Sequence, residues 1–210
     1  RKRGPTNPDN HCALNVAIYS KGQGRWAMTE RGQRHCHRSE RQFKIGPSQM
    51  NWDGDCLTID IDEVCVPIPR RVRGRIKLWP QQLFGYSTPL DVAGQHRWGP
   101  LAPASRIEVD LSAPDLKWQG HAYLDSNEGD EPVDQGFHTW DWSRARTRDG
   151  STVVFYDMQA PGTEDRVLSL RFTPKGTVEP IATPPAQRLS KTAWRIARRM
   201  RSAHPVRVHE

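Results

Sequence analysis

Apolar and polar residues alternate along several short segments of the chain, and this period of two predicts β-strands with one buried face. In residues 55–62, every second residue from Leu57 to Ile61 is apolar, and the residues between them are polar. Residues 73–79 and 106–111 alternate in the same way. We expect further strands at residues 13–19, 25–29, 49–52, 116–124, 152–158 and 166–172.

Turn signals separate these segments. The pair Asp53-Gly54 lies between two expected strands, and Asp149-Gly150 precedes another. Asp-Gly favours the two-residue type I′ turn of a β-hairpin. Many short strands with 17 Pro and 16 Gly indicate an all-β fold, either an antiparallel barrel or a sandwich, continuing into a partial second β domain. A closed barrel would leave no exposed strand edge and could hold a ligand.

The ends of the chain differ from its body. We expect a basic N-terminal stub at residues 1–9, β structure that carries the site at 10–178, and a Pro-containing linker with a basic segment at 179–210. Residues 191–201 fit a basic amphipathic helix or, equally, a strand. Because the chain opens with Arg1 rather than Met, we expect it to be part of a longer protein.

The net charge of +7 is concentrated at the two ends. Residues 1–3 contribute +3 and residues 188–210 contribute +6, which leaves −2 for residues 4–187. A nucleic-acid groove needs a basic stripe across the fold, so we expect no nucleic-acid partner. Basic ends suit attraction to an anionic membrane surface, although solvated tails explain the charge equally well.

The sequence predicts no metal or cofactor site. The four cysteines, Cys12, Cys36, Cys56 and Cys65, lack the paired spacing of a zinc site, and we expect reduced thiols. In His35-Cys36-His37, alternate residues of a strand face opposite ways, so the two histidines alone would share a face. The chain also contains no Gly-rich phosphate-binding loop.

Acidic and aromatic residues are concentrated between residues 118 and 142. Lys117 and Arg144 enclose a stretch without any Lys or Arg. Carboxylates among aromatic rings, with no cation nearby, are expected to have raised pKa values and can then act as general acids. The six carboxylates are Asp125, Glu128, Asp130, Glu131, Asp134 and Asp141, and the three tryptophans and one tyrosine among them are Trp118, Trp140, Trp142 and Tyr123.

Several passages resemble the bacterial carotenoid 1,2-hydratases, also called hydroxyneurosporene synthases, which have a lipocalin-like fold. The most specific are Trp118-Gln-Gly-His-Ala-Tyr-Leu-Asp-Ser-Asn127 and residues 129–144, taken together. The resemblance covers most of residues 10–200, and shorter matches lie at residues 10–17, 25–32, 52–55 and 95–98. Members of this family extend further at both ends, which also indicates that this chain is an internal portion.

The resemblance implies four catalytic residues. The family's His-x-Trp element matches His96 and Trp98, and its Tyr-x-Asp element matches Tyr123 and Asp125. Residues two apart on a strand point to the same face, so each pair can project into one cavity. Asn127, Asp130, Glu131 and Asp141 are expected to hold the loop and to tune Asp125.

The resemblance implies cofactor-independent hydration of the terminal 1,2 double bond of acyclic carotenoids such as neurosporene or lycopene, and of the 1′,2′ bond when both ends react. Asp125 would protonate C2, Trp98 and Tyr123 would stabilise the tertiary cation at C1, and His96 would orient water or take its proton. The partners would be the carotenoid, water and an anionic membrane, with the protein peripheral to a membrane in the bacterial cytoplasm.

Other interpretations remain for the same residues. His96, Trp98 and Tyr123 could be packing residues, and Asp125 could cap a turn. A lipocalin-like barrel could bind carotenoid or another lipid without reacting, because fold does not fix function. Clustered acids and tryptophans also suit a carbohydrate-active β protein.

Overall fold

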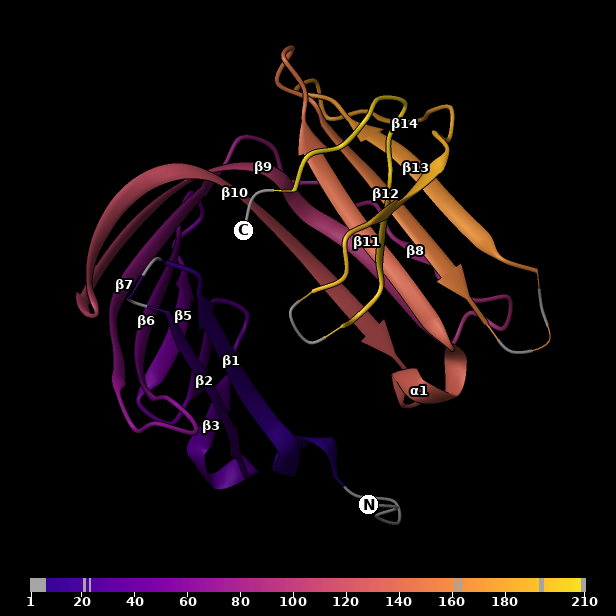
Figure 1. The fold of residues 1–210 in the computed structure, drawn as a ribbon. Helices are drawn as coiled ribbons and strands as arrows, with labels where there is room; N and C mark the ends of the chain where they lie inside the picture. The colour runs from indigo at the N-terminus through magenta and orange to yellow at the C-terminus, as the bar shows by residue number, and fades with distance from the viewer. Residues whose placement is uncertain are drawn as a thin grey trace. The chain divides into compact units, whose positions relative to one another are not determined.

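The computed structural model describes residues 7–20, 22, 24–160, 162, 164–192 and 195–208. These residues are almost entirely strands and turns (Figure 1). The three short helices are η1 (Pro8–His11), η2 (Gln33–His35) and α1 (Val133–Gly136). The strands are β1 (Cys12–Ile18), β2 (Arg25–Arg31), β3 (Cys36–Arg38), β4 (Gln42–Ile45), β5 (Ser48–Trp52), β6 (Leu57–Val64), β7 (Arg71–Pro80), β8 (Thr88–Pro89), β9 (His96–Ala113), β10 (Asp115–Gly129), β11 (Thr139–Arg146), β12 (Thr152–Gln159), β13 (Arg166–Phe172), β14 (Val178–Pro180), β15 (Ala186–Leu189) and β16 (Arg198–Arg201).

These strands form antiparallel sheets built mainly from hairpins. The largest sheet has the order β10-β9-β7-β6-β5-β4-β3, and β8 pairs with β9 at its side. Another sheet has the order β11-β12-β13-β14, and β1-β2 and β15-β16 form two-stranded sheets. In the described part of the chain no sheet closes on itself, so the barrel alternative is wrong here and the strands form open, packed sheets.

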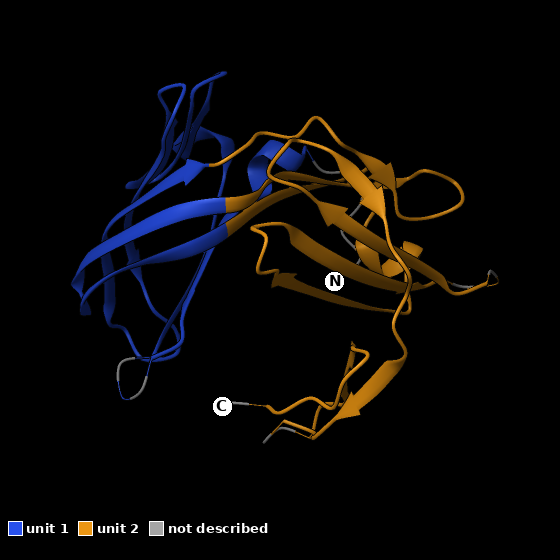
Figure 2. Cartoon of the chain, turned by 90° about the horizontal axis from the view of Figure 1, so that it is seen from above, with its two compact units in different colours: residues 1–80, 105–122 blue, residues 81–104, 123–210 orange. Residues whose placement is uncertain are grey.

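The chain divides into two compact β units (Figure 2). Unit 1 comprises residues 1–80 and 105–122, and unit 2 comprises residues 81–104 and 123–210. The long strands β9 and β10 contribute to both units, because the division falls within each of them. His96, Trp98, Tyr123 and Asp125 therefore all belong to unit 2.

Unit 1 combines a small apolar core with a buried ion pair. Ala27, Ile61, Cys65 and Val72 form the core. Glu63 is 1% exposed, and its carboxylate accepts hydrogen bonds from Ser48 Oγ (2.6 Å), Thr29 Oγ1 (2.9 Å) and Arg31 Nη2 (2.9 Å). A buried charge is tolerated when it is paired and hydrogen-bonded in this way. The network ties β2 to β5 and β6.

Unit 2 has the larger apolar core. Trp98 on β9 packs edge to face against Tyr156 of β12 (5.7 Å between ring centroids) and Phe172 of β13 (6.2 Å). This contact places the sheet β11-β12-β13-β14 over the first part of β9. The buried residues of the core are Phe84, Leu90, Trp98, Phe137, Val154, Tyr156, Met158, Leu170 and Phe172.

The predicted hairpins are confirmed, but the Asp53-Gly54 turn is longer than expected. Trp52 pairs with Leu57, so four residues rather than two connect β5 to β6. Asp53 Oδ1 accepts the backbone N–H groups of Asp55 (2.9 Å) and Cys56 (2.8 Å), which draws those residues into the turn. These bonds also lower the pKa of Asp53 below its ordinary value.

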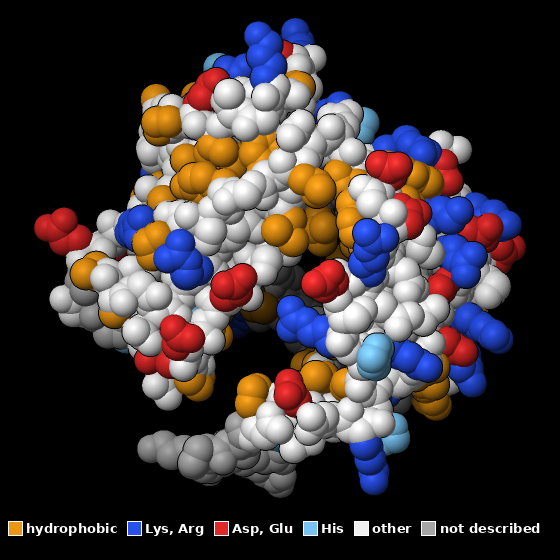
Figure 3. Space-filling model, turned by 180° about the vertical axis from the view of Figure 1, so that it is seen from behind, with side chains coloured by type: hydrophobic (Ala, Val, Ile, Leu, Met, Phe, Trp, Pro, Cys, Tyr) orange, Lys and Arg blue, Asp and Glu red, His pale blue; other side chains and the backbone are white. Residues whose placement is uncertain are grey.

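In the C-terminal segment, the strand alternative holds for the residues that the structure describes near its end. Residues 198–201 are β16, paired with β15, while residues 193 and 194 lie outside the described residues. Among the helices that the structure describes, none has the length and apolar character needed to cross a bilayer. On the face seen in Figure 3, basic and acidic side chains are interspersed.

Candidate active site

Three of the four expected residues are joined by hydrogen bonds to one oxygen atom. Asp125 Oδ2 accepts a hydrogen bond from Trp98 Nε1 at 2.8 Å and another from the Tyr123 hydroxyl at 3.2 Å. The bond from Trp98 crosses from β9 to β10, whereas Tyr123 and Asp125 are two apart on β10. Because successive side chains of a strand point to opposite faces, Tyr123 and Asp125 lie on the same face of β10, as the sequence predicts.

Trp98 is held rigidly by its surroundings. Its side chain is 1% exposed and its ring packs against Tyr156 and Phe172. A buried indole N–H needs a hydrogen-bond acceptor, and Asp125 supplies it. Trp98 is therefore both a packing residue of unit 2 and a donor to Asp125, so the two interpretations of this residue are compatible.

Tyr123 is largely buried and stays protonated. Burial raises the pKa of its hydroxyl well above the ordinary 10.0, and the charge and hydrogen bond of Asp125 raise it further, against smaller opposing effects of Trp98 and Arg144. Trp142 lies 5.1 Å from the Tyr123 ring, and the Arg144 guanidinium lies 5.3 Å from the ring centroid. At neutral pH Tyr123 is thus a hydrogen-bond donor to Asp125.

This raised pKa predicts a loss of stability at alkaline pH. Below the unfolded pKa of about 10 the contribution of Tyr123 is complete, and it is lost as pH rises above that value because unfolding then releases a proton. The free energy of unfolding should fall by up to about 1.4 kcal/mol per pH unit more in the wild type than in Tyr123→Phe. Urea denaturation of both proteins between about pH 8.5 and 11 measures the two unfolding free energies. If their difference stayed constant across this pH range, the prediction would be wrong.

Among the hydrogen bonds of the described residues, His96 is joined to Asp91 and not to Trp98, Tyr123 or Asp125. His96 is 5% exposed, and its Nδ1 lies 3.0 Å from Asp91 Oδ2. Asp91 Oδ2 also accepts the backbone N–H of His96 (2.7 Å), and Asp91 Oδ1 accepts that of Gln95 (3.0 Å). Burial acts to raise the pKa of Asp91, but the hydrogen bonds from Gln95 and His96 outweigh it, so this pKa lies below its ordinary value.

A cavity of about 340 Å³ lies beside His96. Tyr156 lines this cavity and also packs against Trp98, so it connects the two halves of the site. Burial raises the pKa of Tyr156, and the charge of Asp125 raises it further. The cavity is lined by Leu90, His96, Arg97, Asn127, Glu128, Gly129, Glu131, Val133, Phe137, Trp140 and Tyr156.

The expectation that no cation lies near the acid-rich segment is wrong for Asp141. Arg199 of β16 forms an ion pair with Asp141 of β11, and Arg201 pairs with Asp157 of β12. These arginines are more than forty residues away in the sequence, so only the packing of β16 against β11 reveals them. Asn127, Glu128 and Glu131 line the cavity, and the backbone N–H of Asp130 donates to Gln95 O at 2.9 Å.

Asp91 and Tyr156 are the site residues that the sequence pattern missed. Asp91 precedes His96 by five residues within Leu90-Asp-Val-Ala-Gly94, where its carboxylate can bond backbone groups of the same turn. Its position in a turn before a histidine was the available signal. Tyr156 lies on an expected core strand, and nothing in its local pattern distinguishes it from a packing residue.

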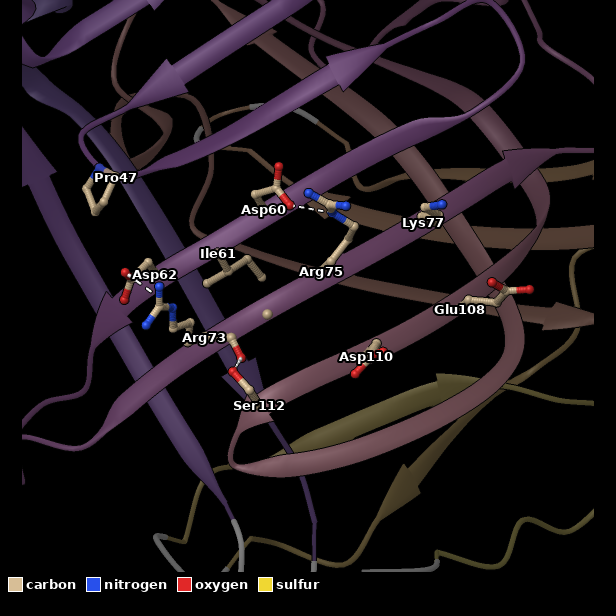
Figure 4. A pocket seen from close by; sticks show the side chains of 11 residues that line it. Pro47, Asp60, Ile61, Asp62, Arg73, Arg75, Lys77, Glu108, Asp110 and Ser112 are labelled. Carbon is tan, nitrogen blue, oxygen red and sulfur yellow. Dashed lines mark hydrogen bonds and ion pairs between the residues drawn. The ribbon is translucent and has the colours of Figure 1, made fainter.

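A second cavity, in unit 1, has a different character (Figure 4). It has a volume of about 680 Å³ and lies over β6, β7 and β9. Its charged side chains neutralise one another: Asp60 pairs with Arg75 (2.6 Å) and Asp62 with Arg73 (3.7 Å). These cross-strand pairs satisfy the polar groups of the cavity, which suits a solvated sheet face rather than an apolar ligand.

The fold belongs to a lipocalin-like β class. A solved structure described as an AttH protein from Nitrosomonas europaea superposes with a TM-score of 0.65 over 89% of this chain and 63% of that chain, at 14% identity. That likeness shows the fold alone. The family is shown by the sequence. The protein-family model described as "Carotenoid hydratase CrtC" matches residues 1–210, so the chain belongs to the carotenoid hydratase family.

Curated relatives in this family are named acyclic carotenoid 1,2-hydratase. The relative from Rubrivivax gelatinosus is 54% identical over 201 residues, which cover 96% of this chain and 50% of the relative. The relative from Thiocapsa roseopersicina is 48% identical, covering 100% and 52%, and that from Rhodobacter capsulatus is 36% identical, covering 100% and 75%. The chain spans about half the length of the first two relatives.

Proposed function

We propose that this chain carries the reaction centre of a carotenoid 1,2-hydratase. It adds water to the terminal 1,2 double bond of an acyclic carotenoid such as neurosporene or lycopene, without a cofactor, and gives a tertiary alcohol. The observation that carries the proposal is the convergence of Trp98 and Tyr123 on one oxygen of Asp125. Membership of the carotenoid hydratase family supplies the substrate class.

The reaction begins with the Asp125 carboxylic acid. An isolated alkene is a very weak base, so the step needs a well-placed donor and a stabilised conjugate base. The two hydrogen bonds to Oδ2 stabilise the carboxylate that remains after the proton has left, and they leave Oδ1 as the oxygen that holds the proton. The proton adds to C2 of the carotenoid, and the positive charge forms at the tertiary carbon C1.

Aromatic rings and a histidine complete the reaction. The faces of Trp98, Tyr123 and Tyr156 stabilise a cation by about 0.5–2 kcal/mol each when water is excluded. Water attacks C1 and loses a proton to His96 Nε2; release of that proton from His96 to solvent and uptake of one proton by Asp125 restore both groups. The balance is one water added per double bond, with no change of oxidation state in the protein.

Incubation with lycopene or neurosporene in detergent, followed by mass spectrometry, tests the proposal. A hydratase gives products heavier by one water for each modified end. A carrier of the same fold would bind the polyene and return it unchanged, and that result would overturn the enzymatic proposal. Binding of glycans instead of polyenes would favour the carbohydrate-active alternative.

We further propose that the protein works at the periphery of a bacterial inner or photosynthetic membrane. Acyclic carotenoids are confined to the apolar interior of a bilayer, and the basic residues near the C-terminus favour an anionic surface. Flotation with anionic vesicles, absent with neutral vesicles, is the expected behaviour; equal recovery with both would count against it.

A further inference from the structure

The environment of His96 differs on the two sides of its ring. Nδ1 faces Asp91 Oδ2 at 3.0 Å. Nε2 is buried and has no hydrogen-bond partner among the residues that the structure describes. A buried polar atom without a partner is rare and needs a physical explanation.

Asp91 is fixed independently of His96 Nδ1. Its two carboxylate oxygens accept the backbone N–H groups of Gln95 and His96, so the carboxylate closes the turn that precedes β9. These bonds favour the ionised form of Asp91. An ionised carboxylate only accepts, so Nδ1 must carry the hydrogen of this pair.

Two glycines bring the backbone close against the ring. A Cβ added to Gly136 would lie 2.5 Å from His96 Cε1, and one added to Gly129 would lie 3.0 Å from His96 Cδ2. Phe137 packs edge to face on the ring at 5.0 Å between centroids. The two glycines and Phe137 thus hold the imidazole in the plane that Asp91 selects.

We infer that Asp91 is the positioning residue of His96: it holds the neutral Nδ1–H tautomer and so presents Nε2 as the proton acceptor for the attacking water. In a neutral imidazole one nitrogen is a donor and the other an acceptor, and the bond to one decides the role of the other. Asp91 touches neither substrate nor water in this scheme. The inference rests on the proposed function in one respect: the hydration reaction provides the water that gives its proton to Nε2.

Other charged and titratable groups lie around this pair. The Asp91 and His96 variants leave these side chains unchanged. Asp91 comes from the turn before β9, and His96 lies at the start of β9. The remaining groups around the cavity are Arg97 of β9, Glu128 of β10, Glu131 before α1 and Tyr156 of β12.

Nitrogen NMR of the histidine rings tests the tautomer without any substrate. The measurement is made above about pH 8, where an ordinary histidine is neutral. His96, assigned by its loss in His96→Gln, should show Nδ1 protonated and Nε2 bare. An Nε2–H tautomer, or a doubly protonated ring, would overturn the inference even if Asp91→Asn failed to fold.

Kinetics of Asp91→Asn separate positioning from a structural role. One of the three bonds to Asp91 is lost in this variant, and because the amide can turn either its oxygen or its NH₂ group toward Nδ1, it no longer restricts the ring to the Nδ1–H tautomer. We expect kcat for lycopene hydration to fall at least about tenfold with carotenoid affinity unchanged. Asp53→Asn is the control for replacing a turn-closing carboxylate elsewhere in the chain, because Asp53 Oδ1 accepts two backbone N–H groups of its own turn.

The outcomes keep the two proposals apart. If the wild type hydrates no carotenoid, the proposed function fails and the NMR result still decides the tautomer. If the wild type is active, an unchanged kcat and an unchanged His96 spectrum in Asp91→Asn would overturn the role of Asp91 alone. An equal loss in Asp53→Asn would show a general effect of turn disruption and would also overturn it.

Discussion

Replacing Asp125 by Asn is expected to lower the rate of carotenoid hydration by about 10²- to 10⁴-fold, the range that a positioned general acid contributes. The amide oxygen of Asn can still accept hydrogen bonds from Trp98 and Tyr123, so the site should keep its shape. The amide holds no acidic proton that could be given to an alkene. Product formation from lycopene, measured together with carotenoid binding, separates lost chemistry from lost affinity.

Asp134→Asn is the control for this experiment. Asp134 belongs to the same acid-rich segment but lies exposed on α1, whereas Asp125 is partly buried and accepts hydrogen bonds from Trp98 and Tyr123. Its substitution should leave hydration unchanged. If Asp125→Asn kept the wild-type rate, Asp125 would not be the proton donor, and another carboxylate of the segment would have to be considered.

Replacing Trp98 by Ala is expected to cost about 3–5 kcal/mol of unfolding free energy, the range for a fully buried large aromatic residue. Such a loss is a large part of the 5–15 kcal/mol that stabilises a typical domain. The cost has two sources: a cavity between β9, β12 and β13, and the loss of the hydrogen bond to Asp125. Urea denaturation followed by circular dichroism measures it.

Two further tryptophan variants separate the effect of the buried ring of Trp98 from that of its N–H group. Trp118 is 44% exposed and belongs to unit 1, so Trp118→Ala should cost much less. Trp98→Phe keeps an aromatic ring in the core but has no N–H for Asp125, and it should lower hydration by more than its effect on stability explains. Equal stability losses in Trp98→Ala and Trp118→Ala would contradict the described core of unit 2.

The sequence predicts the parts of this molecule that depend on short-range patterns. Alternation located β6, and Asp-Gly pairs located two hairpins, because the period of a strand and the preference of a turn are local properties. The pairs His96 with Trp98 and Tyr123 with Asp125 were predicted from a motif resemblance, and their i, i+2 spacing explains why each shares a face.

Features that depend on distant residues were not predicted. The cation beside Asp141 is Arg199, which β16 brings against β11, and no local pattern connects the two. The length of the Asp53 turn depends on two hydrogen bonds that the dipeptide signal does not contain. The open sheets also could not be told from a closed barrel, because closure depends on which strand edges pair and not on the strands themselves.

Hydration of lycopene in D₂O by the wild type and by Asp125→Asn shows whether Asp125 delivers the proton to the carotenoid. Acid catalysis at this site predicts that the wild type gives a product with deuterium at C2 and the hydroxyl group at C1, and that Asp125→Asn gives almost none. A wild-type product without deuterium at C2, or the same product at the same rate from Asp125→Asn, would contradict protonation of the carotenoid by Asp125.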